Sequence, residues 1–383
     1  MSSCRLACTG NWSSGLNVLF SGVKTRRCSG SAASLRRSQT TAAKHASGPD
    51  TGHKPRLRAI DLARKVQQER TKQQPAEPPV SGQQRRVTEL KRFSQQLQNV
   101  HPNVLAKHLH RGVLYQDKDV VVINKPYGVP VRDDSGVTSI SSVLPILSKM
   151  MDGMKIRSNS QLLPCLGLEK ETTGALLLVR REEAAEHILN LNRNNQVQRK
   201  YWVVTVGVPV PSEGVIDIPI IEREVTGSQP HYKMALSPLF KMNDAGDGLT
   251  KVRGHRQAQS AVTRYRVLDS SSGCSLVELQ PFTGAKHQMR VHMAFALACP
   301  ILGDHKYSHW SKLAPQKLPE RVLGNLGLEQ SKIRYLPLHL HARQLTLPGT
   351  SQADVSVSCP LPKYFTQTLS RLHLSLPDEK DQK

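Results

Sequence analysis

The most unusual placement of a charged side chain is in the stretch LLPCLGLEKETTGALLL, residues 162–178. Glu169 follows one apolar run and is separated from the next only by Lys-Glu-Thr-Thr-Gly. A carboxylate in such a place is expected to be partly buried, which is costly unless a cation or hydrogen-bond donor lies beside it. It could act as a nucleophile or a general base. The alternative is a solvated turn of Glu169, Lys170 and Glu171, with Thr172 capping the next element.

A second cluster of reactive side chains lies in TGAKHQMRVH, residues 283–292. Gly284 opens either a short strand or the start of a helix. If the segment is extended, Gln288, Arg290 and His292 share one face, which is then polar and cationic. Arg290 is therefore a candidate partner for Glu169. A metal site built on the histidines of the segment would lack a neighbouring acidic or cysteine ligand, so no metal is expected.

Two shorter motifs combine an aromatic ring with a lysine. NKPYGVPV places Lys125 and Tyr127 in a turn after a strand, where functional loops are common, although a plain β-turn is the alternative. In QRKYWVV, Tyr201 begins an apolar strand, and most tyrosines in strands pack in the core with a satisfied hydroxyl. His339 and His341 in LHLHARQL are expected to hydrogen-bond within a strand rather than to bind a metal.

The elements that must position these residues follow from hydrophobic periodicity. Strands are expected within residues 113–126, 175–181, 200–208, 260–268, 274–282 and 343–349. Helices are expected at residues 57–74, 85–100, 141–154, 182–194 and 291–299. Several strands follow each other without an intervening helix, which favours an α+β fold with a mixed, largely antiparallel sheet and flanking helices over a doubly wound fold.

The composition divides the chain into four parts. Residues 1–50 are rich in Arg and Ser and have no acidic residue before Asp50, which is typical of a disordered mitochondrial transit peptide. Residues 51–104 are expected to form a basic helical arm that the segment PAEPPVSG breaks, because proline cannot continue a helix. Residues 105–350 are expected to form the catalytic domain, and residues 351–383 a C-terminal extension.

The charge of the chain indicates a polyanionic partner. It has 53 Lys and Arg against 30 Asp and Glu, a formal net charge of +23. Without the seven basic residues of positions 1–49, 46 basic residues still face 30 acidic ones, so nucleic acid is the first candidate. The basic segment 231–256 is either a loop that tracks phosphates or a solvated loop.

The expected compartment is the mitochondrial matrix. No stretch approaches the roughly 18 consecutive apolar residues of a membrane span, so a soluble protein is expected. The seven cysteines contain no C-x-x-C pair, which argues against a zinc or redox motif. A nuclear or cytoplasmic pool is left open.

Seven motifs in this order resemble those of the RluA-type pseudouridine synthases, over about residues 105–348. They are NKPYGVPV, EKETTGALLL, KYWVVTVG, AVTRYRVLDSS, LQPFTGAKHQMRVH, PILGDHKYS and LHLHARQLTLP. The resemblance implies a catalytic domain that isomerises uridine in RNA without a cofactor. The C1′–N1 bond is cut, the uracil turns, and C5 is joined to C1′, with the target nucleotide flipped out of its stack.

The resemblance also implies the roles of individual residues. In the family an Asp supplies the carboxylate, a Tyr stacks on the uracil and is placed to take the C5 proton, and a basic residue pairs with the Asp. By motif, these roles fall on Glu169, Tyr201 and Arg290. RNA contacts are expected from Lys125, Tyr127, Lys170, Lys200, Lys286, His287 and Gln288.

The sequence departs from the family just before Lys-Glu-Thr-Thr-Gly. Members typically have His-Arg-Leu-Asp, where this chain has Leu166, Gly167, Leu168 and Glu169. Gly167 cannot make the contact by which the family's Arg replaces the flipped base. Glu169 keeps the charge but moves the carboxylate by about an ångström, a displacement that can cost on the order of 100-fold in rate.

Three functions are compatible with these observations. The first is a synthase acting on mitochondrial rRNA, tRNA or mRNA, favoured because a carboxylate persists at the family's catalytic position. The second is an RNA-binding pseudoenzyme that supports mitochondrial ribosome or transcript maturation, with ribosome assembly factors as further partners. The third is a glycoside hydrolase using Glu169 and Glu171, which would need both acids to converge on one sugar and is disfavoured by the basic charge.

Overall fold

The computed structural model describes residues 59–73, 81–132, 137–152, 161–226, 230–238, 240–242, 249–349 and 354–377. The chain forms two compact units, residues 1–75 and residues 76–383. In the first unit the described element is helix α1 (Ala59–Gln73), on which Ile60, Leu62 and Val66 are exposed. The transit peptide expected at residues 1–50 lies outside the described residues.

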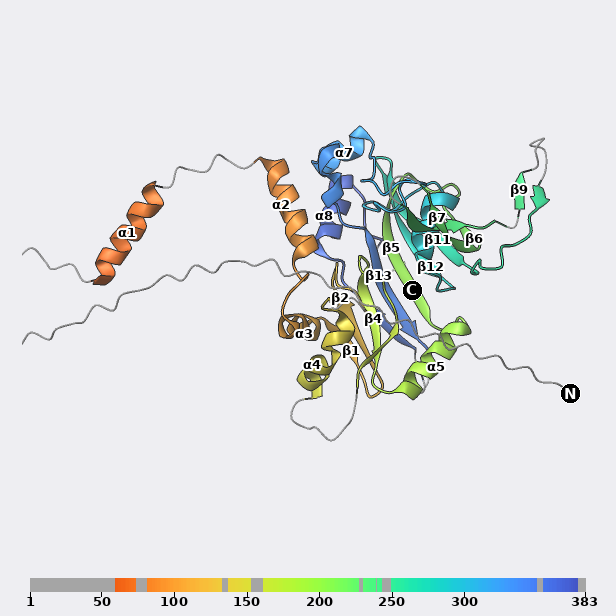
Figure 1. The fold of residues 1–383 in the computed structure, drawn as a ribbon, viewed down its shortest axis with the longest axis horizontal. Helices are drawn as coiled ribbons and strands as arrows, with labels where there is room; N and C mark the ends of the chain where they lie inside the picture. The colour runs from red at the N-terminus through yellow and green to blue at the C-terminus, as the bar shows by residue number, and fades with distance from the viewer. Residues whose placement is uncertain are drawn as a thin grey trace, which may run out of the picture. The chain divides into compact units, whose positions relative to one another are not determined.

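The second unit is built on one large sheet, drawn in Figure 1. Its strands run in the order β1-β2-β4-β13-β5-β12-β11-β6, with β3 paired to β4 and β14 paired to β13. Their bounds are β1 (Val113–Gln116), β2 (Val120–Lys125), β3 (Leu163–Leu166), β4 (Thr173–Val179), β5 (Gln198–Val206), β6 (Glu213–Asp217), β11 (Val262–Ser271), β12 (Cys274–Pro281), β13 (Leu340–Leu347) and β14 (Val355–Ser358). Every pairing in this sheet is antiparallel except β4 with β13, so the α+β prediction is confirmed.

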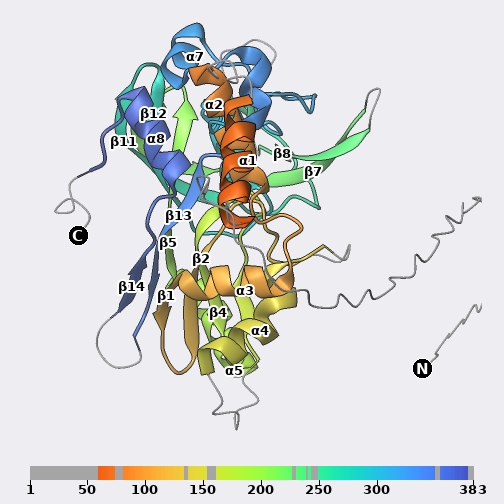
Figure 2. The ribbon, with the colours of Figure 1, turned by 90° about the vertical axis from the view of Figure 1, so that its left-hand side faces the viewer.

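Helices of the second unit cover the sheet in two groups, as Figures 1 and 2 show. They are α2 (Gly82–Gln95), α3 (Pro102–Arg111), α4 (Ile140–Asp152), α5 (Glu182–Arg193), α6 (Gln288–Val291), α7 (Glu320–Leu326) and α8 (Lys363–Leu372), with a π-helical turn at His292–Ala296 and a 3₁₀ turn at Gln330–Tyr335. Helices α3 and α4 pack with β2 and β4 in one core cluster. Helices α2, α7 and α8 pack with β5 and β12 in another. No described helix is long and apolar enough to cross a membrane.

Strand β5 carries two kinds of core contact because successive side chains in a strand point to opposite faces. Trp202 and Val204 face the cluster that contains α2 and α8. Tyr201 and Val203 face the opposite cluster, with residues of β12 and β13. The strand therefore places the Tyr201 ring on the sheet face opposite α8.

The structure corrects the expected boundaries of the catalytic domain. Helix α2 was assigned to the basic arm, but Val87 and Leu90 are buried against Phe365 of α8 in one cluster. Helix α8 in turn belongs to the core rather than to an extension beyond it. The reason is burial of apolar side chains, which contribute roughly 1.5–3 kcal/mol each when fully buried.

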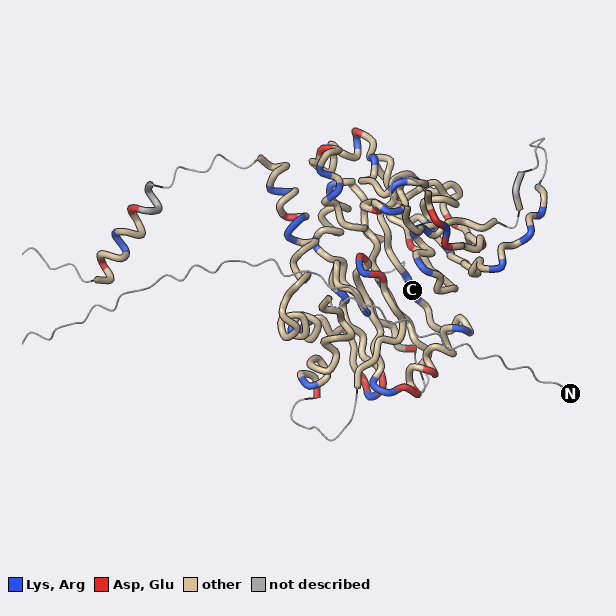
Figure 3. The backbone as a smooth tube through the Cα atoms, in the orientation of Figure 1, with Lys and Arg blue, Asp and Glu red and all other residues tan. Residues whose placement is uncertain are grey.

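Two ribbons project from the sheet on its β6 side, one formed by β7 (Ile220–Val225) and β8 (His231–Leu236) and the other by β9 (Phe240–Met242) and β10 (Leu249–Lys251). The basic segment 231–256 is thus partly β-structured rather than irregular. Figure 3 shows Lys and Arg recurring in the stretch that begins at the end of β10, where Lys251, Arg253 and Arg256 are exposed. This spacing suits the contact with phosphates that was considered for the segment.

Candidate active site

Glu169 lies in the loop that joins β3 to β4, and Lys125 at the end of β2 fixes this loop. The Lys125 ammonium donates hydrogen bonds to the carbonyls of Pro126 (3.1 Å), Lys170 (2.9 Å) and Thr172 (2.9 Å). Lys125 is fully buried, and burial lowers its pKa to about 7, although the nearby Glu171 and Glu169 carboxylates raise it. Because three acceptors meet one side chain, the loop backbone is tied to the sheet on both sides of Glu171.

Arg290 joins two carboxylates. Its Nη1 donates to Glu169 Oε2 at 2.7 Å, while Nε and Nη2 donate to the two oxygens of Asp304, each at 2.8 Å. The planar guanidinium matches a carboxylate in this two-bond geometry. Asp304 also accepts the backbone N–H groups of Lys306 and Tyr307, so it is held independently of Arg290.

The electrostatics of this group keep Arg290 and Asp304 charged. Burial alone would lower the pKa of Arg290, but hydrogen bonds and the charges of Asp304 and Glu169 raise it. Burial alone would raise the pKa of Asp304, whose side chain is 1 % exposed, but the bonds and charge of Arg290 lower it. Arg290 is therefore a fixed cation that presents one nitrogen to Glu169.

A cavity of about 280 Å³ opens beside Glu169, whose side chain is 25 % exposed. Tyr201, Arg199 and His287 line it together with Glu169. Burial raises the pKa of Tyr201, and the charge of Arg199 lowers it. The cavity thus combines a carboxylate, a neutral phenol beside it and a cation, which can hold a planar polar ring next to a nucleophile or base.

Comparisons with known proteins identify the family. The family model described as "RNA pseudouridylate synthase" matches residues 119–295. The chain is 60 % identical over 343 residues to "Pseudouridylate synthase RPUSD4, mitochondrial" of Danio rerio, covering 88 % of this chain and 93 % of that protein. The chain belongs to the RNA pseudouridylate synthases.

Two further relatives agree. The Homo sapiens protein of the same description is 53 % identical over 328 residues, covering 84 % of this chain and 86 % of that one. The solved structure "Human RNA Pseudouridylate Synthase Domain Containing 4" is similar with a TM-score of 0.64 at 52 % identity, covering 72 % of this synthase and 98 % of that chain. The family expected from the seven motifs is thereby confirmed.

The structure brings the three expected catalytic residues of the synthase together. Glu169 and Tyr201 line one cavity, and Arg290 contacts Glu169 from behind it. The segment that carries Arg290 is helical, which is the second of the two alternatives considered, so the polar face that an extended segment would give Gln288, Arg290 and His292 does not form. Arg290 reaches Glu169 because the short helix α6 points its long side chain across the site.

The expected RNA contacts separate into exposed and buried residues. Lys170 and Lys286 are exposed, Lys200 is partly exposed, and Lys286 pairs with Glu222 at 2.8 Å. Gln288 is buried, and its amide bonds Thr283, Ala285, Val262 and Thr263 within the protein. Its amide therefore positions the loop before α6 and does not reach RNA.

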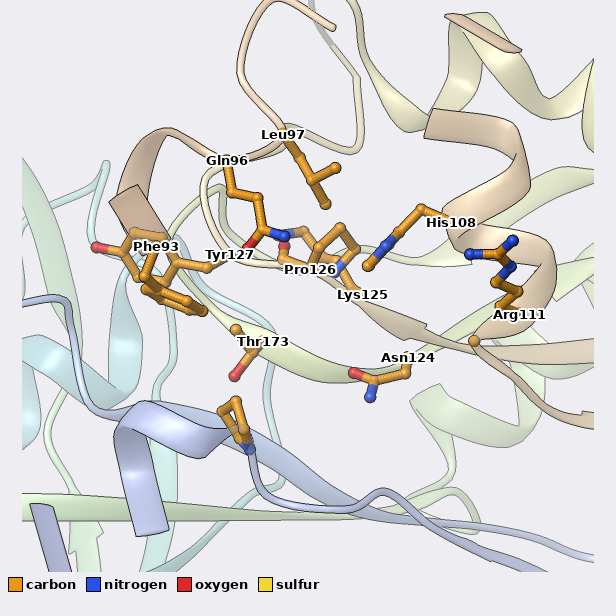
Figure 4. A pocket seen from close by; sticks show the side chains of 12 residues that line it. Phe93, Gln96, Leu97, His108, Arg111, Asn124, Lys125, Pro126, Tyr127 and Thr173 are labelled. Carbon is orange, nitrogen blue, oxygen red and sulfur yellow. The ribbon is translucent and has the colours of Figure 1, made fainter. Parts of the chain in front are cut away.

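Lys125 and Tyr127 also have structural partners. The Tyr127 hydroxyl accepts the backbone N–H of Leu338 at 3.3 Å, and its ring packs 5.4 Å from that of Phe93. Both residues line a second cavity of about 330 Å³, together with His108 and Arg111 (Figure 4). Lys125 has no exposed ammonium with which to bind a phosphate, so the RNA contact expected of it is corrected to a positioning role.

Sequence reasoning missed three residues of the site. Asp304 and Tyr307 lie in PILGDHKYS, which was used only as a family motif. The signal for Asp304 was its position directly after an apolar pair and a glycine, where a carboxylate is expected to be buried. Arg199 lines the cavity and precedes Lys200 in β5. Because successive side chains of a strand point to opposite faces, the sequence could have placed Arg199 rather than Lys200 on the face of Tyr201. His341 lies in β13 and bonds Thr173, as expected, whereas His339 precedes that strand and bonds Thr368 of α8. Within the described residues, no three metal-ligating side chains come close enough to hold an ion.

Proposed function

We propose that this synthase isomerises uridine to pseudouridine in mitochondrial RNA and that Glu169 is its active-site carboxylate. The observation that carries this proposal is the 2.7 Å contact between Glu169 Oε2 and the buried Arg290. Arg290 holds the carboxylate by this hydrogen bond and positions it beside the cavity. Oε1 accepts no hydrogen bond from the described residues, so it is the oxygen that faces C1′ of a flipped uridine.

The remaining steps are assigned to the residues around Glu169. The carboxylate attacks C1′ or takes a proton while the C1′–N1 bond breaks, and the uracil turns within the cavity. The Tyr201 ring stacks on the uracil, and its oxygen accepts the C5 proton as its own O–H proton passes to solvent through the open cavity. Arg199 assists, because its charge lowers the pKa of that phenol.

RNA is held around the mouth of the cavity by exposed cations. Lys286 lines the cavity and the exposed Lys170 follows Glu169 in the loop, while Lys251, Arg253 and Arg256 add exposed cations at the end of β10 and after it. Such residues contact phosphates without reading sequence. Mitochondrial rRNA, tRNA and mRNA are the candidate substrates, since the similar proteins are named mitochondrial. A matrix location agrees with the composition of residues 1–50.

The test is release of tritium from RNA labelled at uridine C5. Recombinant enzyme is incubated with mitochondrial rRNA and tRNA, and we expect release from wild type and none above background from Glu169→Ala. Glu171→Ala is the matched control, because it removes a carboxylate from the same loop but outside the cavity lining. RNA binding without release from the wild type would instead support the pseudoenzyme hypothesis, which rests on Gly167 and Glu169 standing where the family has Arg and Asp.

A further inference from the structure

His287 has a hydrogen-bond partner that determines where its proton lies. Its Nδ1 is 2.5 Å from the Tyr307 hydroxyl oxygen, which also accepts the backbone N–H of Met234 at 3.3 Å. Tyr307 is 1 % exposed, and a hydroxyl has one proton to donate. If Nδ1 carried a proton, the buried Tyr307 proton would have no acceptor among the described residues, which costs about 1–3 kcal/mol. Tyr307 therefore donates to Nδ1.

The second nitrogen of His287 then carries the proton of the neutral ring. Burial lowers the pKa of His287 to about 3, and the Arg290, Lys306 and Lys286 charges act in the same direction. Neutral imidazole has one N–H, so with Nδ1 accepting, that N–H is at Nε2. The backbone of His287 is left-handed, with φ of 57°, a conformation that the surrounding structure must enforce in a non-glycine residue.

Nε2 is placed at the reactive end of the cavity. It lies 3.9 Å from Glu169 Oε2, too far for a hydrogen bond, and His287 lines the same cavity as Tyr201. By the proposed function, on which this inference rests, Glu169 marks the position of C1′. The donor consequently faces the junction between sugar and base rather than the far edge of the uracil.

We propose that His287 donates its Nε2–H to a carbonyl oxygen of the flipped uracil, to O2 in the uridine and to O4 in the pseudouridine. In uracil, C2=O is next to N1 and C4=O is next to C5. The half-turn that exchanges N1 for C5 at C1′ also exchanges the two carbonyls. One fixed donor thus serves the base before and after rotation, and no side chain has to move.

The donor is most valuable while the glycosidic bond is broken. The bonding electrons of C1′–N1 leave with the uracil, whose negative charge is shared between N1, O2 and O4. Removing a preorganised donor that is aimed at such charge lowers the rate by a factor of about 10²–10³. His287 is therefore a substrate-binding residue whose loss lowers kcat more than it raises KM.

Two variants separate this role from a structural one. His287→Asn tolerates the left-handed backbone, and its amide oxygen can accept the Tyr307 proton, but its side chain ends short of the cavity. His287→Gln is longer and offers an N–H₂ near the place of Nε2. In the tritium-release assay we expect Asn to lower kcat about 100-fold and Gln to recover about tenfold of this loss. Equal losses with a lowered melting temperature, or an Asn variant with wild-type kcat, would overturn the proposal.

The substrate atom and the tautomer are tested separately. In RNA transcribed with 2-thiouridine, the sulfur that replaces O2 is a weak acceptor. On this RNA the kcat of wild type should no longer exceed that of His287→Asn, and an unchanged ratio of the two kcat values would contradict the O2 contact. In ¹⁵N NMR of the full chain, the histidine signal absent from His287→Asn should show a proton on Nε2 and none on Nδ1. The NMR result is independent of turnover, so a wrong tautomer and an inactive enzyme are distinguishable outcomes.

Discussion

Replacing Asp304 by Asn tests whether the Arg290 clamp supports the site. The carboxylate is 1 % exposed and the guanidinium 7 % exposed, and two 2.8 Å bonds join them. Asn keeps the shape but turns an N–H₂ toward one guanidinium nitrogen and removes the charge. Removing one partner of a buried pair costs about 3–5 kcal/mol, because the other charge is left without compensation. Because Arg290 keeps its bond to Glu169, we expect the free energy of unfolding of Asp304→Asn to fall by up to this amount.

The same change should slow the reaction. An Arg290 held on one side only no longer fixes Glu169, and a displacement of about 1 Å can cost on the order of 100-fold in rate. Urea denaturation at neutral pH measures the stability, and tritium release measures kcat. Asp119→Asn is the control, since Asp119 and its partner Arg181 have side chains that are 41 % and 55 % exposed. Loss of this exposed ion pair should lower the free energy of unfolding by at most about 1 kcal/mol.

The pH dependence has a defined sign. The folded-state pKa of Asp304 lies below its ordinary value of 3.8. The stabilisation by this carboxylate is therefore complete above that value and is lost as the pH falls through the lower folded-state pKa. Wild type should lose this contribution in acid, whereas Asp304→Asn lacks it at every pH. If Asp304→Asn matched wild type in both stability and kcat, the clamp would not be what positions Glu169.

Two other substitutions probe the loop of Glu169. Lys125→Met leaves three buried carbonyls without a donor, so it should cost roughly 3 kcal/mol or more and lower kcat more than it changes KM. Burial lowers the pKa of Lys125 from 10.5 to about 7, so between these two pH values the unfolded chain binds more protons than the folded chain. The stability of wild type relative to this variant should therefore rise with pH in that range, as measured by urea denaturation. Gly167→Arg has no atom within 4 Å of the added Cβ, so melting curves should show a stability change of at most about 0.5 kcal/mol. The added cation should tighten RNA binding, and in binding titrations the slope of log K against log salt concentration should steepen by up to about one unit. Unchanged binding would contradict this expectation.

The strands that carry the site could be predicted because their side chains are buried on both faces. Residues of β2, β4 and β5 form nearly continuous apolar runs, and their short length, together with the β-branched residues of β2 and β5, favours buried strands over helices. The helix α6 was not predictable in the same way. It has four residues, and Gln288 and Arg290 face inward through specific bonds rather than through apolar periodicity.

The terminal helices show a different limit. In α8, Tyr364, Phe365, Thr368, Leu369 and Leu372 are the buried residues, a helical spacing that was readable from the sequence. What could not be read was their partner, because α2 lies more than 260 residues earlier and carries the charged segment QQRR. Arg86 of that segment is itself buried and donates to Gln367 at 2.8 Å. A basic segment was thus assigned to a solvated arm although it packs in the core.

The structure also bears on the Glu that replaces the family's Asp. Arg290 is held by Asp304 through two bonds that do not involve Glu169, and the loop backbone is held by Lys125 through carbonyls. Both ends of the Glu169 interaction are therefore set independently of its side-chain length. The extra methylene has to be taken up by the torsions of Glu169 itself, and Oε2 still reaches Arg290 at 2.7 Å. The ion pair thus accepts the longer side chain, and what the substitution can change is the placement of Oε1 against the sugar.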